Sequence, residues 1–173
     1  MRLRPYKSCD AKTIVEWIKD ENIFLKWGGA RFGSFPIEPS TINDKYYKNN
    51  GDCAEEDNFF PWSAIDDNNK IVGHFIMRYT GGDNRQLRFG WVVVDDSIRG
   101  KGYGKQMLIL GLKYAFEIFK VERVTIGVFE NNEPALWCYK KSGFVETEIV
   151  KGEPWNVVEM EILKKNYYVQ KAC

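Results

Sequence analysis

The sequence predicts an α/β protein, a mixed sandwich in which a sheet is crossed by helices. Apolar residues make up 44% of the chain and aromatic residues 15%, which is enough to fill a proper core. Short apolar or alternating runs separated by turn residues are typical of strands, and two longer segments repeat apolar side chains at helical spacing. The resulting order is strands, helix, strand, helix and strands.

Length and charge narrow the class of protein. A chain of 173 residues suits one domain, so residues 1–173 are predicted to form a single unit. The 25 basic residues nearly cancel the 24 acidic ones, and this balance argues against a nucleic-acid partner. No signal peptide and no run of about 18 apolar residues is present. The expectation is a cytoplasmic protein without a membrane partner.

Cysteine and histidine usage argues against a metal site. Four cysteines stand at long, irregular spacings, and no Cys-x-x-Cys pair occurs: Cys9, Cys53, Cys138 and Cys173. The single histidine, His74, cannot complete a Cys/His metal site. We therefore expect four reduced thiols and no metal.

The first third of the chain predicts two helices separated by loops. Leu3–Tyr6 reads as a short strand, and Asp10 is the expected N-cap of a helix that ends at Asp20. Residues 27–40 are rich in glycine and proline and indicate a loop. A short helix capped by Ser40 or Thr41 is expected to end at Tyr47, followed by a polar loop over residues 49–58.

The rest of the chain is more regular. A hairpin is predicted from two runs joined by Asp66-Asp67-Asn68-Asn69, and four further strands follow the same reasoning. The expected strands are 59–65, 70–79, 87–95, 123–129, 144–151 and 157–163. Two helices lie between them. The first begins at the glycine loop with a stripe of Tyr103, Met107, Gly111, Tyr114, Ala115 and Ile118, and the second runs from Pro134 to Lys141 with Gly143 as its stop.

The glycine loop between strand 87–95 and the following helix predicts an anion site. Helix N-terminal N–H groups lack intrahelical partners and carry the positive end of the helix dipole. Glycines let an anion approach the backbone closely, and basic side chains add charge. The segment consists of Arg99, Gly100, Lys101, Gly102, Tyr103, Gly104 and Lys105. A glycine-rich turn without a ligand is the alternative.

Two common phosphate motifs do not fit this loop. A dinucleotide fingerprint requires a third glycine where the chain has Lys105 or Met107. A P-loop requires a glycine in place of Arg99 and a Ser or Thr in place of Gln106. The phosphate ligand is therefore of another class.

The loop resembles the signature of the GCN5-related N-acetyltransferase (GNAT) superfamily, Arg/Gln-x-x-Gly-x-Gly/Ala. Arg99, Gly102 and Gly104 match it, and Val94 stands where the family usually has a valine. The resemblance implies a GNAT-like, largely antiparallel central sheet flanked by helices and acetyl-CoA as co-substrate. It implies that the backbone of Val92, Val93 and Val94 pairs with the pantetheine arm, and that N–H groups from Gly100 to Lys105 bind the pyrophosphate.

A second segment resembles the family pattern Asn-x-x-Ala-x-x-x-Tyr followed by Gly-Phe. It begins at Asn132, includes Ala135 and Tyr139, and ends at Gly143-Phe144. By that resemblance Asn132 contacts the cofactor and Tyr139 is the general acid for the leaving thiolate. Packing of Tyr139 between helix and sheet is the alternative. The chain opening is similar to the branch that contains ribosomal-protein N-terminal and aminoglycoside acetyltransferases.

The general base is the part of the reaction that the resemblance does not supply. In the similar branch a glutamate often starts the fourth strand, but Arg88 takes that position here. The other candidates are His74, Asp83, Glu130 and Glu133, with a structural role favoured for His74. A water chain or an amine that arrives neutral would need no base.

The acceptor is expected to be a small-molecule or peptide amine, and its identity cannot be read from the sequence. Aromatics among the glycines of residues 21–40 are candidates for a substrate wall or for a loop on the core: Phe24, Trp27, Arg31, Phe32 and Phe35. An acidic run is more simply a solvated surface than a cation trap: Asp52, Glu55, Glu56 and Asp57. The family often pairs, so a homodimer is a further expectation. The alternative to an enzyme is a non-catalytic acyl-CoA-binding or sensing module.

Overall fold

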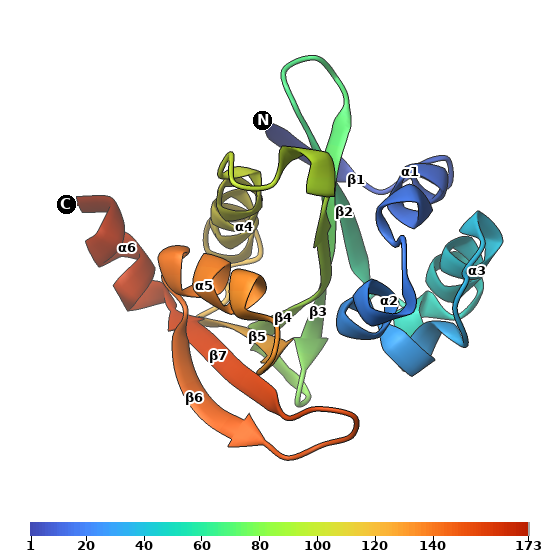
Figure 1. Ribbon diagram of the computed structural model, residues 1–173. Coiled ribbons are helices and arrows are strands. Elements are labelled where there is room, and N and C mark those ends of the chain that lie inside the picture. Colours follow the sequence, from blue (N-terminus) through green and yellow to red (C-terminus); the bar gives the residue numbers. More distant parts are fainter. Residues whose placement is uncertain (173) are drawn as a thin grey trace.

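The computed structural model describes residues 1–172, which form a seven-stranded sheet with helices against both faces (Figure 1). The strands are β1 (Arg2–Pro5), β2 (Phe60–Ile65), β3 (Ile71–Thr80), β4 (Asp83–Val94), β5 (Arg123–Phe129), β6 (Val145–Val150) and β7 (Val157–Leu163). The helices are α1 (Asp10–Trp17), α2 (Glu21–Trp27), α3 (Pro39–Asn43), α4 (Tyr103–Lys113), α5 (Glu133–Lys141) and α6 (Lys164–Ala172).

The sheet confirms the predicted mixed, largely antiparallel architecture. Its order is β1-β2-β3-β4-β5-β7-β6, and β4 and β5 form its one parallel pair. In Figure 1, α4 and α5 lie on one side of the sheet and α1, α2 and α3 on the other. Within residues 1–172, no helix is both long and apolar enough to cross a bilayer.

Two apolar cores sit on the two faces of the sheet. Phe75 and Met77 of β3 belong to the core under α4, whereas Ile76 between them belongs to the core under α1–α3. This arrangement follows from the strand period of two, which sends successive side chains to opposite faces. Gly111 allows α4 to approach closely, because a Cβ there would stand 2.9 Å from the Phe75 ring. β3 is therefore covered on both sides.

The start of α1 differs from the prediction. Cys9 is the N-cap, without a side-chain cap bond, and Asp10 is the first helical residue. The fully buried Asp10 carboxylate instead accepts hydrogen bonds from the Arg4 guanidinium at 2.6 and 2.8 Å and from the Ser63 hydroxyl at 2.6 Å. Asp10 thus ties α1 to β1 and β2, and the helix ends at Trp17 rather than Asp20.

Other helical predictions need smaller corrections. Residues 21–27 form α2, capped by Asp20, whose carboxylate accepts from the Ile23 N–H. The N-cap of α3 is Glu38 instead of Ser40 or Thr41. One residue of the apolar stripe predicted along α4 and the helical turn after it points to solvent: Ile118 has 68% of its surface exposed. Helix α6 was not predicted, and Cys173 lies outside the described residues.

Candidate functional site

The predicted glycine loop lies between the end of β4 and the start of α4. Gly100 and Gly102 have φ angles of 78° and 80°, a region that favours glycine, and Gly102 is the N-cap of α4. A Cβ at either glycine would meet no atom within 4 Å, so the space above both backbones is open. Gly104 is favoured for a different reason. A Cβ added at this position would stand 3.3 Å from the Cys138 sulfur on α5.

Positive charge at this loop is not neutralised by the protein. The first turn of α4 has no side-chain cap, so its N–H groups remain available as donors. Within residues 1–172, no ion pair engages any of the three exposed cations of the loop, Arg99, Lys101 and Lys105. Free donors, the helix dipole and cations without ion pairs are features that favour anion binding. Pyrophosphate binding by this loop stays a prediction.

A bulge at Trp91 opens the sheet next to this loop. Ile76 pairs with Gly90 and His74 pairs with Val93, so Trp91 and Val92 together oppose Phe75 alone. Trp91 adopts a φ of 47°, which is unusual for a side chain of that size. The parallel ladder with β5 ends at Phe89 and Ile126. Beyond the bulge, β4 and β5 are no longer paired.

A cavity of about 380 Å³ occupies the region where β4 and β5 diverge. Its walls come from α2 and the turn after it, from β3, β4 and β5, from α5, and from the segment before β7. Of the three predicted valines, Val92 lines the cavity. Val93 packs into the core under α1–α3, and Val94 packs beside Gly104. The backbone edge of β4 after Phe89 has no strand partner on the β5 side.

Tyr139 and Asn132 bring α5 into the same cavity. Tyr139 is 6% exposed, and its hydroxyl forms no hydrogen bond with any of the described residues. Burial, and secondarily the Cys138 thiol, raises the pKa of Tyr139, so the phenol stays protonated near neutral pH. Asn132 is the N-cap of α5 but makes no side-chain cap bond. Both predicted side chains are therefore free to act on a ligand in the cavity.

None of the predicted candidate bases lines this cavity. Asp83 binds the Arg85 side chain, Glu130 accepts from Asn156 at 3.0 and 3.1 Å, and Glu133 is exposed on the first turn of α5. His74 is fully buried, and its Nε2 lies 2.7 Å from the Tyr46 hydroxyl. Burial lowers the pKa of His74 to about 3. The favoured structural role for His74 agrees with this burial.

The buried neutral His74 leads to a prediction about acid stability. The unfolded chain binds a proton at His74 below about pH 6.5, whereas the folded chain does so only near pH 3. The free energy of unfolding should therefore fall by about 1.4 kcal/mol per pH unit from this group as the pH drops from 6 to 4. Urea titrations of the protein and of His74→Gln measure it, and the variant should lose that slope. Because His74 is the single histidine, a ring resonance that titrates near pH 6.5 in the folded protein would contradict the prediction.

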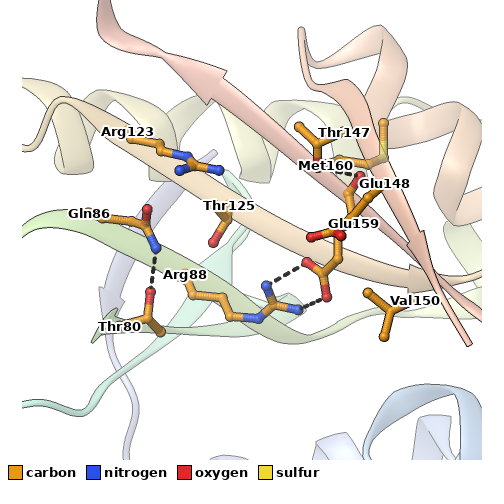
Figure 2. Close-up of a pocket in the computed structure, with 10 residues that line it drawn as sticks. All are labelled: Thr80, Gln86, Arg88, Arg123, Thr125, Thr147, Glu148, Val150, Glu159 and Met160. Atoms are coloured by element: carbon orange, nitrogen blue, oxygen red, sulfur yellow. Dashed lines mark hydrogen bonds and ion pairs between the residues drawn. The ribbon is translucent and has the colours of Figure 1, made fainter. Parts of the chain in front are cut away.

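Arg88, in place of the family glutamate, is held in an ion pair at the side of the site. Its guanidinium donates to Glu159 on β7 at 2.6 and 2.7 Å, and Figure 2 shows this pair in a neighbouring hollow. Gly127 on β5 makes the pair possible, since a Cβ there would stand 2.5 Å from the Arg88 Nη2 atom. Arg88 therefore brings a cation, already paired with a carboxylate, to the position where the family often has a base.

The predicted aromatic wall divides into two parts. Trp27 and Arg31 line the cavity, and the Trp27 indole N–H donates to the Trp91 carbonyl at 2.8 Å. The three phenylalanines of the set pack into or against the core under α1–α3: Phe24, Phe32 and Phe35. The acidic run lies on the surface and does not line the cavity, and Asp52 is held by Lys45 at 2.8 Å. It is a solvated charge run, as the sequence favoured.

Sequence reasoning missed several cavity residues. Arg78 of β3 faces the cavity because β3 and β4 place Arg78 opposite Arg88. Glu153 and Pro154 reach it from the β6–β7 connection, and Val157 from the start of β7. No group of three or more potential metal ligands occurs among the residues that the structure describes.

Comparison with known proteins identifies what the chain is similar to. The family model of the Acetyltransferase (GNAT) domain matches residues 1–145. The spermine/spermidine N(1)-acetyltransferase of Bacillus subtilis (strain 168) is 37% identical over 51 residues, which cover 30% of this chain. The match spans 34% of that relative's own length.

Two solved structures share the fold over nearly the whole chain. Spermidine N-acetyltransferase from Vibrio cholerae, in complex with CoA and spermine, has a TM-score of 0.77 at 21% identity, covering 96% of each chain. The aminoglycoside acetyltransferase AAC(6')-Ib, in complex with coenzyme A, has a TM-score of 0.79 at 17% identity, covering 98% of each chain. At these identities the likeness establishes the fold.

Proposed function

Because this chain belongs to the GNAT acetyltransferase family, we propose that it transfers an acetyl group from acetyl-CoA to a primary amine by direct attack. The observation that carries the proposal is the placement of two groups at helix α5: a proton donor and a cationic helix start. The free Tyr139 hydroxyl lies at the cavity that opens where β4 and β5 diverge, and the uncapped, cationic start of α4 lies beside the same helix α5, where Gly104 approaches Cys138. An anion site for a pyrophosphate and a proton donor for a thiolate are what the reaction requires.

The fit to acetyl-CoA rests on features of this chain. The open space above Gly100 and Gly102 leaves room for the pyrophosphate, with N–H donors from the segment Gly100 to Lys105 apart from Lys101, whose N–H donates to the Ile98 carbonyl at 3.4 Å. Arg99, Lys101 and Lys105 supply free positive charge. The unpaired edge of β4 offers the backbone of Val92, Val93 and Val94 to the amides of the pantetheine arm, and Asn132 adds a side-chain contact.

The proposed chemistry assigns a role to each group around the reacting atoms. The amine nitrogen forms a bond to the thioester carbonyl carbon, and the carbon–sulfur bond then breaks. N–H groups near Trp91 to Val93 stabilise the oxyanion that develops. Tyr139 gives its proton to the departing thiolate. The proton lost by the amine passes to water, since none of the predicted bases lines the cavity.

The proposal also covers the extent of the domain, the compartment in which it acts and its oligomeric state. We propose that residues 1–173 act as one N-acetyltransferase domain in the cytoplasm. Three cysteines without disulfides, Cys9, Cys53 and Cys138, support a reducing compartment. A homodimer is part of the proposal, supported by the apolar side chains that edge strand β6 leaves exposed: Val145, Ile149 and Val150.

A thiol-release assay tests the function. Purified protein is mixed with acetyl-CoA and a panel of amines comprising peptides, aminoglycosides, polyamines and amino acids. The expected result is amine-dependent release of CoA thiol together with an acetylated product detected by mass spectrometry. Samples without amine control for simple hydrolysis. Tight acetyl-CoA binding by calorimetry with no thiol release from any amine would favour the non-catalytic binding module instead.

A further inference from the structure

The cavity wall carries a surplus of positive charge. Four cationic side chains line it but only one acidic side chain: Lys26, Arg31, Arg78 and Arg88 against Glu153. Two of the cations are already engaged. Arg88 is paired with Glu159, and the Lys26 ammonium donates to the Asn131 carbonyl at 3.1 Å. Arg78 also forms a side-chain hydrogen bond with the Cys53 thiol, but that thiol brings no carboxylate. Arg31 and Arg78 are therefore the two cations that need an explanation.

Arg31 and Arg78 have no carboxylate partner. Within residues 1–172, neither guanidinium takes part in a hydrogen bond or ion pair with an acidic side chain. Loss of hydration lowers the pKa of Arg31, and the nearby charges of Arg78 and Arg88 lower it further. The carboxylate whose charge raises the pKa of Arg31 is that of Asp52, and Asp52 is itself held by Lys45. The guanidinium nonetheless stays charged at neutral pH. Three arginines therefore repel one another around one end of the cavity.

These arginines are separate from the proposed pyrophosphate site. Arg88 precedes Val92 by four residues, which corresponds to roughly 13 Å along a strand, and the glycine loop lies beyond Val94. Arg78 stands opposite Arg88 on β3, and Arg31 comes from the turn after α2. The arginines thus occupy the end of the cavity away from the glycine loop, the end left for the acceptor.

We propose that the acceptor is a small amine that also carries a carboxylate or phosphate, and that Arg31 and Arg78 bind that anionic group. The inference rests on the proposed acetyltransferase function and narrows its substrate class. Arginine binds carboxylates and phosphates in bidentate geometry, and a cleft with one sign of charge concentrates ligands of the opposite sign. The same charges disfavour a polyamine, the substrate named for the Bacillus and Vibrio relatives.

Matched acceptors test the substrate class. Phosphoethanolamine is compared with ethanolamine, β-alanine with β-alaninamide, and spermidine serves as the cationic member. We expect kcat/KM to be at least about tenfold higher for the anionic member of one pair, and that pair identifies phosphate or carboxylate as the group bound. Spermidine should be the poorest acceptor. A preference for the neutral members or for spermidine overturns this inference while the acetyltransferase function stands. If none of these acceptors is acetylated, the proposed acetyltransferase function itself is overturned.

Arginine variants test the assignment of residues. Arg31→Gln and Arg78→Gln should each raise KM for the anionic acceptor about tenfold, and should leave KM for the neutral analogue and for acetyl-CoA nearly unchanged. Arg85→Gln is the matched control, because Arg85 lies on β4 outside the cavity in an ion pair with Asp83. Arg31→Lys keeps the charge and should retain most of the affinity. Equal losses for anionic and neutral acceptors, in variants with unchanged thermal unfolding, would overturn the assignment.

Discussion

Replacing Tyr139 by phenylalanine should lower kcat for acetyl transfer by about 10²- to 10³-fold and leave the dissociation constant of acetyl-CoA nearly unchanged. The phenol is buried at the cavity wall, forms no hydrogen bond with the described residues, and stays protonated because burial raises its pKa. Phenylalanine keeps the ring that packs against Phe144, so the loss isolates the proton. Steady-state kinetics and calorimetry measure the two quantities.

A matched variant separates catalysis from packing. Tyr114 packs its ring against Trp62 at 4.9 Å between centroids, outside the cavity. Tyr114→Phe should therefore retain full kcat. If Tyr139→Phe also retained full kcat, Tyr139 would be a packing residue, and the thiolate would take its proton from water.

An aspartate at position 102 should weaken acetyl-CoA binding by roughly thirtyfold compared with an asparagine at the same position. The φ of 80° at Gly102 is tolerated by Asn and Asp better than by other residues, and neither meets an atom within 4 Å at its Cβ. The two variants therefore share their backbone cost and differ in one negative charge. Repulsion between that charge and a pyrophosphate is worth about 2 kcal/mol at a partly exposed site.

The donor itself supplies the control for this pair of variants. An acetylated pantetheine thioester without the pyrophosphate should bind Gly102→Asp and Gly102→Asn equally. The difference for acetyl-CoA should shrink at high salt, as screening requires. An equal affinity of both variants for acetyl-CoA at low salt would remove the pyrophosphate from this loop.

The strands, and the position of the glycine loop between β4 and α4, were largely predictable from sequence. Period-two runs between clear turns placed β5 and β7 at their observed bounds, because tertiary packing and local preference agree there. The α5 stop at Gly143 follows from its φ of 100°. Helix α2 was not predicted because residues 21–27 lie next to a glycine-rich stretch. The one clear indication of a helix there was Asp20 as a possible N-cap.

The arginine end of the cavity was not predictable, for two geometric reasons. The run from Trp91 to Val94 is continuously apolar, so the hydrophobic pattern does not indicate a bulge. Gly90 beside the run is a weak indication of one. The turn at residues 80–83 implies a register in which Arg78 stands opposite Arg85. The ladder instead shifts between Tyr79 and Thr80 and places Arg78 opposite Arg88. The arginine cluster exists only in that shifted register.

The bulge at Trp91 also bears on how such a protein can be re-engineered or can diverge. It divides one cavity between two sets of segments that are remote in sequence. The proposed donor contacts lie in residues 92–105 and 132–139, whereas the other cavity walls come from α2 and its following turn, from the paired positions 78 and 88, and from residues 153–157. The two sets are joined at α2, because the Trp27 indole N–H donates to the Trp91 carbonyl and the Lys26 ammonium donates to the Asn131 carbonyl. An exchange of α2 for that of another acetyltransferase must therefore keep these two hydrogen bonds if the proposed donor contacts are to stay in place.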